Sequence, residues 1–459
     1  MSRSILATTR RWFLLVLACA SAAFTASAAP AQGGPNRFDL AALIRIAMEN
    51  NLSLAADQAA IAASTEGVAA ARGARLPHVD AVGLAEVFPR RERLLLFRHG
   101  FRGNDNPFEN VIANYGMELT LPLYTSGRIE HGISLAEARV EVQRSRSQLS
   151  RQQLVFNVTS AYYTGLRLKE VVTAQNAVLA SLEEALRVGE LQQKVGRLAP
   201  LDLLRLKTRV AQGQRDLAGA HNQYEQALEV VRELVFLPPE EAIVIKGSLR
   251  AADTTTSAPA SREQALAMRP DLQKLRHEVN ARREAIGIAG AALGPSVHLK
   301  ASYRGVTGID NGVTKDDGAL LLQFRVPIFD GGVLDARKRK ALAELNEAQL
   351  RLRAAERRAF SDVDRSILDL RAAGPRITAA RLAVAQGEES LRVERKKFAQ
   401  GRGTSNDLLL AEEALLRART ELALALADSQ IAAARLRLAT GNNPGSDPAP
   451  GTYSGGTSN

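Results

Sequence analysis

The chain has 459 residues and a formal charge of +11, with 46% hydrophobic but only 5% aromatic residues. So few aromatic residues, beside abundant Ala, Leu, Arg and Glu, are typical of long helices and argue against a compact aromatic core. Basic and acidic residues alternate along helical stretches, as in Glu394-Arg395-Lys396-Lys397, which indicates solvated helix faces. We therefore expect no nucleic-acid partner despite the positive charge.

The first residues predict a secretion signal that is not part of the fold. Three arginines precede an apolar run from Trp12 to Ala18, and Ala26-Ser27-Ala28 fits the small-x-small rule for cleavage. We predict a signal peptide over residues 1–28, cleaved after Ala28, with Ala31 as the alternative site.

The same segment also contains features of two other export signals. Arg10-Arg11 before the apolar run resembles a twin-arginine export signal, which would imply folding before export. Cys19 lies in a loose lipoprotein box, which would anchor the chain through a lipid. We favour ordinary secretion, because the apolar run extends past Cys19 and a good cleavage site follows. Cleavage there removes the only cysteine and excludes disulfide and thiol chemistry.

The rest of the sequence repeats itself at a constant offset of 205 residues (327 − 122). The offset does not change between Pro122 and Leu234, so neither copy gains or loses a residue there. Because loops tolerate insertions easily, this indicates packed helices with a fixed register and two tandem copies of one unit. The recurring pairs include Pro122 and Pro327, Gly127 and Gly332, Gly196 and Gly401, Arg197 and Arg402, and Asp202 and Asp407.

Each copy is predicted to begin with an Ala-rich helix, over Asp39–Arg75 and over Arg262–Leu293, that stops at a following proline. Asn36 or Asp39 is the candidate N-cap of the first helix and Ser261 that of the second.

Two short strands follow in each copy. We predict them over residues 78–88 and 113–123, and over 296–307 and 318–328, with polar and apolar residues alternating. Each spans about 10 residues, the length that a tilted strand needs to cross a bilayer. No segment after the signal reaches the ~18 apolar residues of a membrane helix. Four strands cannot close a barrel, so membrane strands would require further copies of the chain.

A very long helix comes next in each copy, over residues 127–195 and 332–400. At 1.5 Å per residue each would extend about 100 Å, and Gly374-Pro375 should kink the second. The apolar residues of the helices that follow each long helix have the 3,4 spacing of a coiled-coil seam.

Tight turns are predicted at 196–200 and 401–405, and return helices at 201–236 and 406–439. The domains are then residues 29–236 with a hairpin over 127–236, a linker at 237–260, residues 261–440 with a hairpin over 332–440, and an irregular tail at 441–459.

These motifs together resemble those of TolC-type outer-membrane efflux proteins over nearly all of the mature sequence. The strand ends are Leu121-Pro-Leu-Tyr-x-x-Gly127 and Val326-Pro-Ile-Phe-x-x-Gly332, and the turns run from Val195 to Leu204 and from Phe398 to Leu409. The resemblance implies a mostly α fold with a small transmembrane β part. Its trimer would form a 12-strand β-barrel continued by a long α-helical coiled-coil barrel, with two tandem structural repeats per chain.

The resemblance also places a periplasmic gate at the two glycine turns. Asp407 falls on the family's constriction aspartate, which three-fold symmetry would repeat as a carboxylate ring that favours cations. The sequence departs from the family at Leu410, where a second aspartate is expected, and at Gly403, where a basic residue is expected. The predicted gate comprises Asp407, Arg402, Phe398, Asp202 and Arg197. The alternative is that both aspartates are ordinary first-turn acids that interact with the helix dipole.

A periplasmic adaptor protein would dock at these tips, and an inner-membrane pump would supply the energy. The predicted adaptor contacts are Val195, Gly196, Ala199, Pro200, Leu201, Gly401, Gly403, Thr404 and Ser405.

The expected function is a passive outer-membrane exit duct for small molecules such as drugs, toxic compounds or metal ions, without cofactor. The alternatives are the same duct in a type I protein secretion system, and a periplasmic coiled-coil scaffold or stalk without a pore. The six histidines have no metal-ligand spacing and we find no catalytic constellation, so we expect no enzyme.

Overall fold

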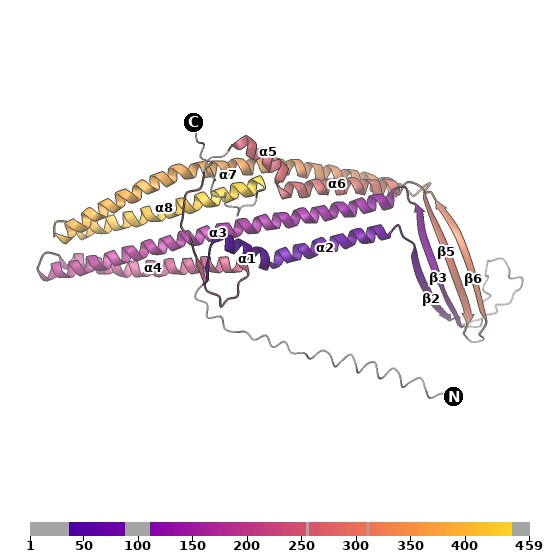
Figure 1. The fold of residues 1–459 in the computed structure, drawn as a ribbon, viewed down its shortest axis with the longest axis horizontal. Helices are drawn as coiled ribbons and strands as arrows, with labels where there is room; N and C mark the ends of the chain where they lie inside the picture. The colour runs from indigo at the N-terminus through magenta and orange to yellow at the C-terminus, as the bar shows by residue number, and fades with distance from the viewer. Residues whose placement is uncertain (1–35, 88–110, 254–256, 310–311, 443–459) are drawn as a thin grey trace, which may run out of the picture.

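The protein forms a long, narrow helical body with a four-stranded sheet at one end (Figure 1). The computed structural model describes residues 36–87, 111–253, 257–309 and 312–442. The predicted signal peptide, both cleavage sites and Cys19 lie outside the described residues, as do most of the first strand loop and of the C-terminal tail.

The first copy begins with two helices, so the predicted single helix over Asp39–Arg75 is wrong. The helices are α1 (Leu40–Asn50) and α2 (Leu52–Gly73), and Asp39 caps α1 by accepting a hydrogen bond from the backbone of Ala42 at 2.8 Å. Asn51 breaks the run because its backbone is extended, at φ −69° and ψ 113°. Its side-chain oxygen accepts hydrogen bonds from the backbone N–H groups of Ser53 and Leu54 at 2.9 and 3.1 Å and so caps a new helix.

The second copy breaks at the matching place, where Pro270 follows Arg269. Proline disfavours helical geometry in the preceding residue, and Arg269 is extended, at φ −64° and ψ 121°. The predicted helix over Arg262–Leu293 is therefore α5 (Ala258–Met268) and α6 (Pro270–Ala291). Ser261 lies inside α5 and is not its N-cap, because the helix begins one turn earlier.

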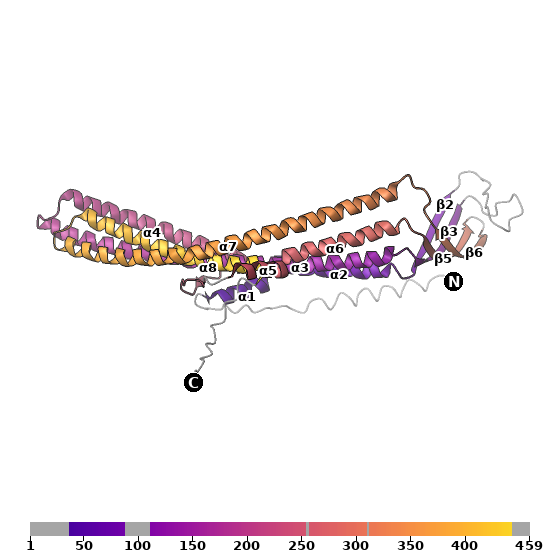
Figure 2. The same cartoon turned by 90° about the horizontal axis from the view of Figure 1, so that it is seen from above.

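Two long hairpins make up most of the body, α3 (Arg128–Lys194) with α4 (Pro200–Val235) and α7 (Val333–Ala399) with α8 (Ser405–Thr440). The long helices have 67 residues each and so extend about 100 Å. α7 continues through Pro375 without a break, and Figure 2 shows it changing direction along its length.

The hairpins pack along the predicted seams. Leu203, Leu206 and Val210 of α4 are buried, as are Leu408, Ala411 and Leu415 of α8. Near the tips, Leu206 joins the seam residues of α8 and Phe398 of α7 in one apolar cluster, so the two hairpins share a core.

The four-stranded sheet is antiparallel throughout, in the order β2-β3-β5-β6. Its strands are β2 (His78–Val87), β3 (Val111–Tyr124), β5 (Ser296–Gly308) and β6 (Thr314–Arg325). β6 begins and ends earlier than the predicted 318–328. The strands of the two copies are joined through β3 and β5, which leaves β2 and β6 as the edges of the sheet.

A small parallel sheet and short helices surround the hairpins near the middle of the body. β1 (Asn36–Phe38) pairs with β4 (Ile243–Ile245), which belongs to the segment between the two copies. Ile245 is fully buried in a cluster with Leu43 of α1 and Val235 of α4. This core fixes the segment that joins the two repeats.

Candidate functional site

The two hairpin tips lie side by side at the end of the body remote from the sheet (Figure 1). Each long helix ends at a glycine in the left-handed region, with φ 71° at Gly196 and 69° at Gly401. The backbone N–H of Arg197 donates to Gln192 O at 2.8 Å, and that of Arg402 donates to Lys397 O at 2.9 Å. Both turns are therefore Schellman motifs, which require the φ that glycine adopts at low cost.

Polar contacts join the two tips. The hydroxyl of Ser405, which is fully buried, donates to Asp202 Oδ1 at 3.0 Å. The side-chain amide of Gln192 donates to the backbone oxygen of Phe398 at 2.6 Å, and the Phe398 ring is buried. Asp202 and Phe398, both predicted gate residues, thus connect the hairpins within one chain.

Asp407 lies in the first turn of α8, where Thr404 is the N-cap. Its backbone N–H donates to Thr404 Oγ1 at 3.1 Å, and that hydroxyl donates to Asp407 Oδ2 at 2.7 Å. The side chain is exposed at the tip. This geometry serves the helix start and still leaves the carboxylate facing solvent.

The predicted arginines do not reach the aspartates. Arg197 and Arg402 are exposed and form no ion pair with any described residue. Asp202 instead pairs with Arg205 at 3.2 Å. Lys397 was missed by sequence reasoning: its pKa is raised, mainly by a hydrogen bond to Glu394 and, to a smaller extent, by the negative charge of Asp407.

The sequence also gave no sign of a buried carboxylate at the contact between the two hairpins. Glu412 of α8 is 2% exposed and pairs with Arg395 of α7 at 2.9 Å. The hydroxyl of Ser181, on α3, donates to the same carboxylate. Glu412 directly follows the seam residue Ala411, so helical spacing alone gave no reason to bury it.

The predicted adaptor contacts form a mostly exposed surface of small and apolar residues. Val195 is 67% and Leu201 58% exposed, and Leu204 of α4 and Leu410 of α8 are similarly exposed. Ser405 is the exception, because its hydroxyl is turned inward to Asp202 and is not available to a partner. Gly403 has little room for a side chain, since a Cβ would lie 2.9 Å from Lys397 Cβ. Gly196, Ala199, Pro200, Gly401 and Thr404 are exposed.

One face of the sheet at the other end is almost wholly apolar, and the other, the polar face, holds most of the charged and polar residues together with Val82, Leu84 and Leu321. Cross-strand pairing places Val79, Leu119, Ala301 and Leu320 in one row, and Leu320 is 73% exposed. The adjacent row on the opposite face holds Asp80, Glu118, Ser302 and Ala319. Among the described residues, nothing covers the apolar face of the sheet or pairs with its edges at β2 and β6.

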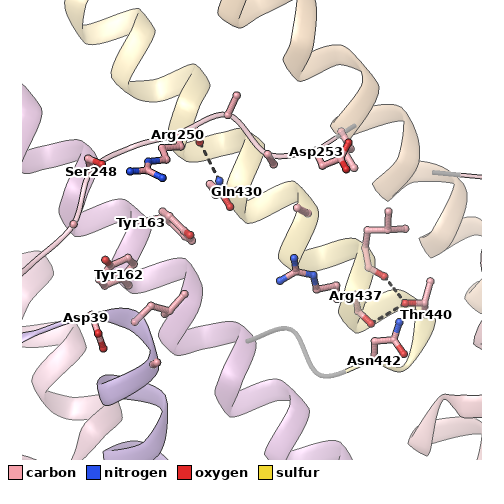
Figure 3. A pocket seen from close by; sticks show the side chains of 18 of the residues that line it. Asp39, Tyr162, Tyr163, Ser248, Arg250, Asp253, Gln430, Arg437, Thr440 and Asn442 are labelled. Carbon is pink, nitrogen blue, oxygen red and sulfur yellow. Dashed lines mark hydrogen bonds between the residues drawn. The ribbon is translucent and has the colours of Figure 1, made fainter. Parts of the chain in front are cut away.

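A pocket of about 760 Å³ lies near the middle of the body, where the segment after β4 crosses α3 and α8 (Figure 3). Its charged lining is balanced, with Asp39 and Asp253 beside Arg250 and Arg437. Gln430 donates to the backbone oxygen of Arg250 at 3.0 Å and holds this segment on α8.

The described residues contain neither a membrane-spanning helix nor a cluster of metal-binding side chains. No described helix is sufficiently long and apolar to span a membrane. Within the same residues, no three His, Cys, Asp or Glu side chains lie close enough together to hold a metal ion.

Known proteins resemble the chain in sequence and in fold. The alkaline protease secretion protein AprF of Pseudomonas aeruginosa is 27% identical over 73% of this chain and 71% of its own length. The outer membrane efflux protein BepC of Brucella suis is 22% identical over 86% of this chain and 83% of its own. The crystal structure of the outer membrane protein VceC of Vibrio cholerae superposes with a TM-score of 0.74 at 20% identity, covering 88% of this chain and 96% of VceC.

The family itself follows from a match along most of the chain. The profile of the outer membrane efflux protein family matches residues 43–235 and 262–442, one stretch in each copy. The predicted resemblance and the mostly helical fold with a small β part are both confirmed. The chain belongs to the outer membrane efflux protein family.

Proposed function

We propose that three copies of this chain form a passive exit duct through the outer membrane and the periplasm. The sheet is the observation that carries this proposal, because its apolar face is bare and both of its edges are open. In lipid each unpaired edge group would cost several kcal/mol. Three sheets joined edge to edge give twelve strands, which close a barrel wide enough for an aqueous lumen.

The helical body continues this duct. The paired long hairpins extend about 100 Å from the sheet and end at the two glycine turns. The exposed small and apolar residues of the tips would meet a periplasmic adaptor protein, which links the duct to an inner-membrane pump. The chain then needs no cofactor and no chemistry of its own.

The gate of this duct is proposed to lie at the tips. Three Asp407 carboxylates around a three-fold axis would favour cations and repel one another, so basic neighbours or bound cations must offset them. Lys397 is one such basic neighbour, because the negative charge of Asp407 contributes to its raised pKa within one chain. The Ser405–Asp202 hydrogen bond would hold the two tips together in the closed state.

Protein secretion is a second candidate function. Its support is the similarity to AprF and, over 101 residues at 35% identity, to the protease secretion protein PrtF of Dickeya chrysanthemi. The efflux duct is preferred because the outer membrane efflux protein BepC matches more of both chains than AprF does, although AprF has the higher identity.

Disruption of the gene in its source organism separates these candidates. An efflux duct predicts greater sensitivity to toxic small molecules with an unchanged set of secreted proteins. A secretion duct predicts the loss of particular proteins from the culture medium. Purified protein that gives no ion conductance in planar bilayers would contradict both, and would favour a stalk without a pore.

A further inference from the structure

A second pocket lies where the sheet meets the helices, at the opposite end of the body from the tips. It has a volume of about 450 Å³ and is bounded by the starts of α3 and β5, the end of β6 and the end of α6. Its polar lining includes Arg128, His298, Lys300, Arg325, Thr120 and Gln323.

Strand register brings these side chains to the polar face of the sheet. Thr120 is paired with Lys300, His298 with Gln323, and Ser296 with Arg325. Residues two apart on a strand share a face, so His298 and Lys300 point the same way. Arg128 comes from the first turn of α3, just beyond the sheet.

The basic groups of this pocket have no acidic counterpart. No Asp or Glu lines the pocket. None of its four basic side chains, Arg128, His298, Lys300 and Arg325, forms an ion pair with a described residue. Glu118, further along the same face, is occupied by Arg304 at 2.5 Å. The pocket in the middle of the body differs, because two acids balance its two arginines.

We infer that this pocket binds the oxyanion group, carboxylate or phosphate, of an anionic ligand. The inference rests on the proposed function and deepens it, since the polar face would line the duct just inside the barrel. Clefts lined by one sign of charge concentrate ions of the opposite sign, and guanidinium groups pair with carboxylate and phosphate through parallel hydrogen bonds. Rings of Arg and Lys are also how pores select anions.

The ligand has two possible sources, a solute in the lumen or an anionic lipid headgroup. The pocket lies on the face opposite the apolar residues, which favours the solute. A trimer would carry three such pockets in one ring, each with three permanent positive charges from Arg128, Lys300 and Arg325.

The test is block of single-channel current by inorganic triphosphate in phosphatidylcholine bilayers, which contain no anionic lipid. The test variant is Lys300→Gln with Arg325→Gln, and the control is Lys315→Gln, on the same face but outside the pocket. The double variant should need an at least ~10-fold higher concentration for half-block, and the control less than ~2-fold. Equal block of wild type and double variant would overturn the inference while leaving the duct intact.

The lipid source gives a different result. Inorganic triphosphate would then not block the wild-type channel in phosphatidylcholine. Phosphatidylglycerol would co-purify with the wild-type protein but not with the double variant. These two results would overturn the assignment of the ligand as a solute. Absence of any wild-type conductance would instead refute the duct. Calorimetric titration of the detergent-solubilised protein with inorganic triphosphate still decides the pocket, because the inference requires affinity at least ~10-fold weaker in the double variant than in wild type.

Discussion

At the residue scale, the two tip aspartates have different surroundings and should have different roles. Asp202 is half-buried and accepts hydrogen bonds from Ser405 and Arg205, so its carboxylate is already paired within the chain. Asp407 is exposed, and Thr404 is the only described hydrogen-bond partner of its carboxylate. Of the two, Asp407 has the carboxylate that could face a pore.

Asp407→Asn should reduce the cation selectivity of the channel and its block by multivalent cations. The amide can still accept the Thr404 hydrogen bond, so the helix start should persist while the charge is lost. Asp202→Asn is the matched control and should change selectivity little. Reversal potentials across a salt gradient measure both. An effect of Asp202→Asn alone would place the gate on the first hairpin, and no effect of either would make both ordinary helix-start acids.

Arg395→Ala should destabilise the packing of α7 on α8 around Glu412, because it leaves this buried carboxylate with Ser181 of α3 as its remaining described partner. We expect a loss of roughly 1–3 kcal/mol, seen as a lower midpoint of thermal unfolding by circular dichroism. The control is Arg419→Ala, which removes an exposed pair with Glu388 worth about 0–1 kcal/mol.

Replacing both charged partners tests the cause of this loss. Arg395→Met with Glu412→Leu removes the buried charge together with its partner, so most of the stability should return. An unfolding midpoint for Arg395→Ala no lower than for Arg419→Ala would show that the pair of Arg395 with the buried Glu412 adds nothing to stability beyond an exposed pair.

At the element scale, the ends of the long helices could be predicted from the sequence, whereas the breaks in the shorter helices could not. The ends of the long helices were predictable to within one or two residues because Gly196 and Gly401 impose a left-handed backbone. The breaks at Asn51 and Arg269 were missed because the Ala-rich pattern continues across them, while a capping side chain and a following proline act locally. Strand faces followed from alternation, but their joining through β3 and β5 is a tertiary property.

Gly196→Val and Gly401→Val should each abolish export while leaving assembly intact. A β-branched residue at φ near 70° is strained by roughly 1–2 kcal/mol, and the turn that presents the docking surface would distort. Gly219→Val on α4 is the control, since that glycine is helical and has open space around its Cβ position. Sensitivity to exported compounds is the readout, and wild-type sensitivity in either tip variant would refute the docking role.

At the scale of the whole molecule, the sequence predicted the two repeats but not the way in which they pack together. The repeat predicted two equivalent halves, and the described elements do follow the same order twice. The sequence placed Asp202, Phe398 and Asp407 near one another at the tips, but not the inward turn of Ser405 or the burial of Glu412. Those depend on how the two hairpins pack, which a pattern within one helix does not report.

The most direct test of this account is the mass of the purified protein in detergent, after correction for bound detergent. The account predicts three chains per particle, because only further copies can cover the edges at β2 and β6 and close a barrel. Chemical crosslinking should yield the same species. A well-folded monomer or dimer with an intact sheet would contradict the proposed duct.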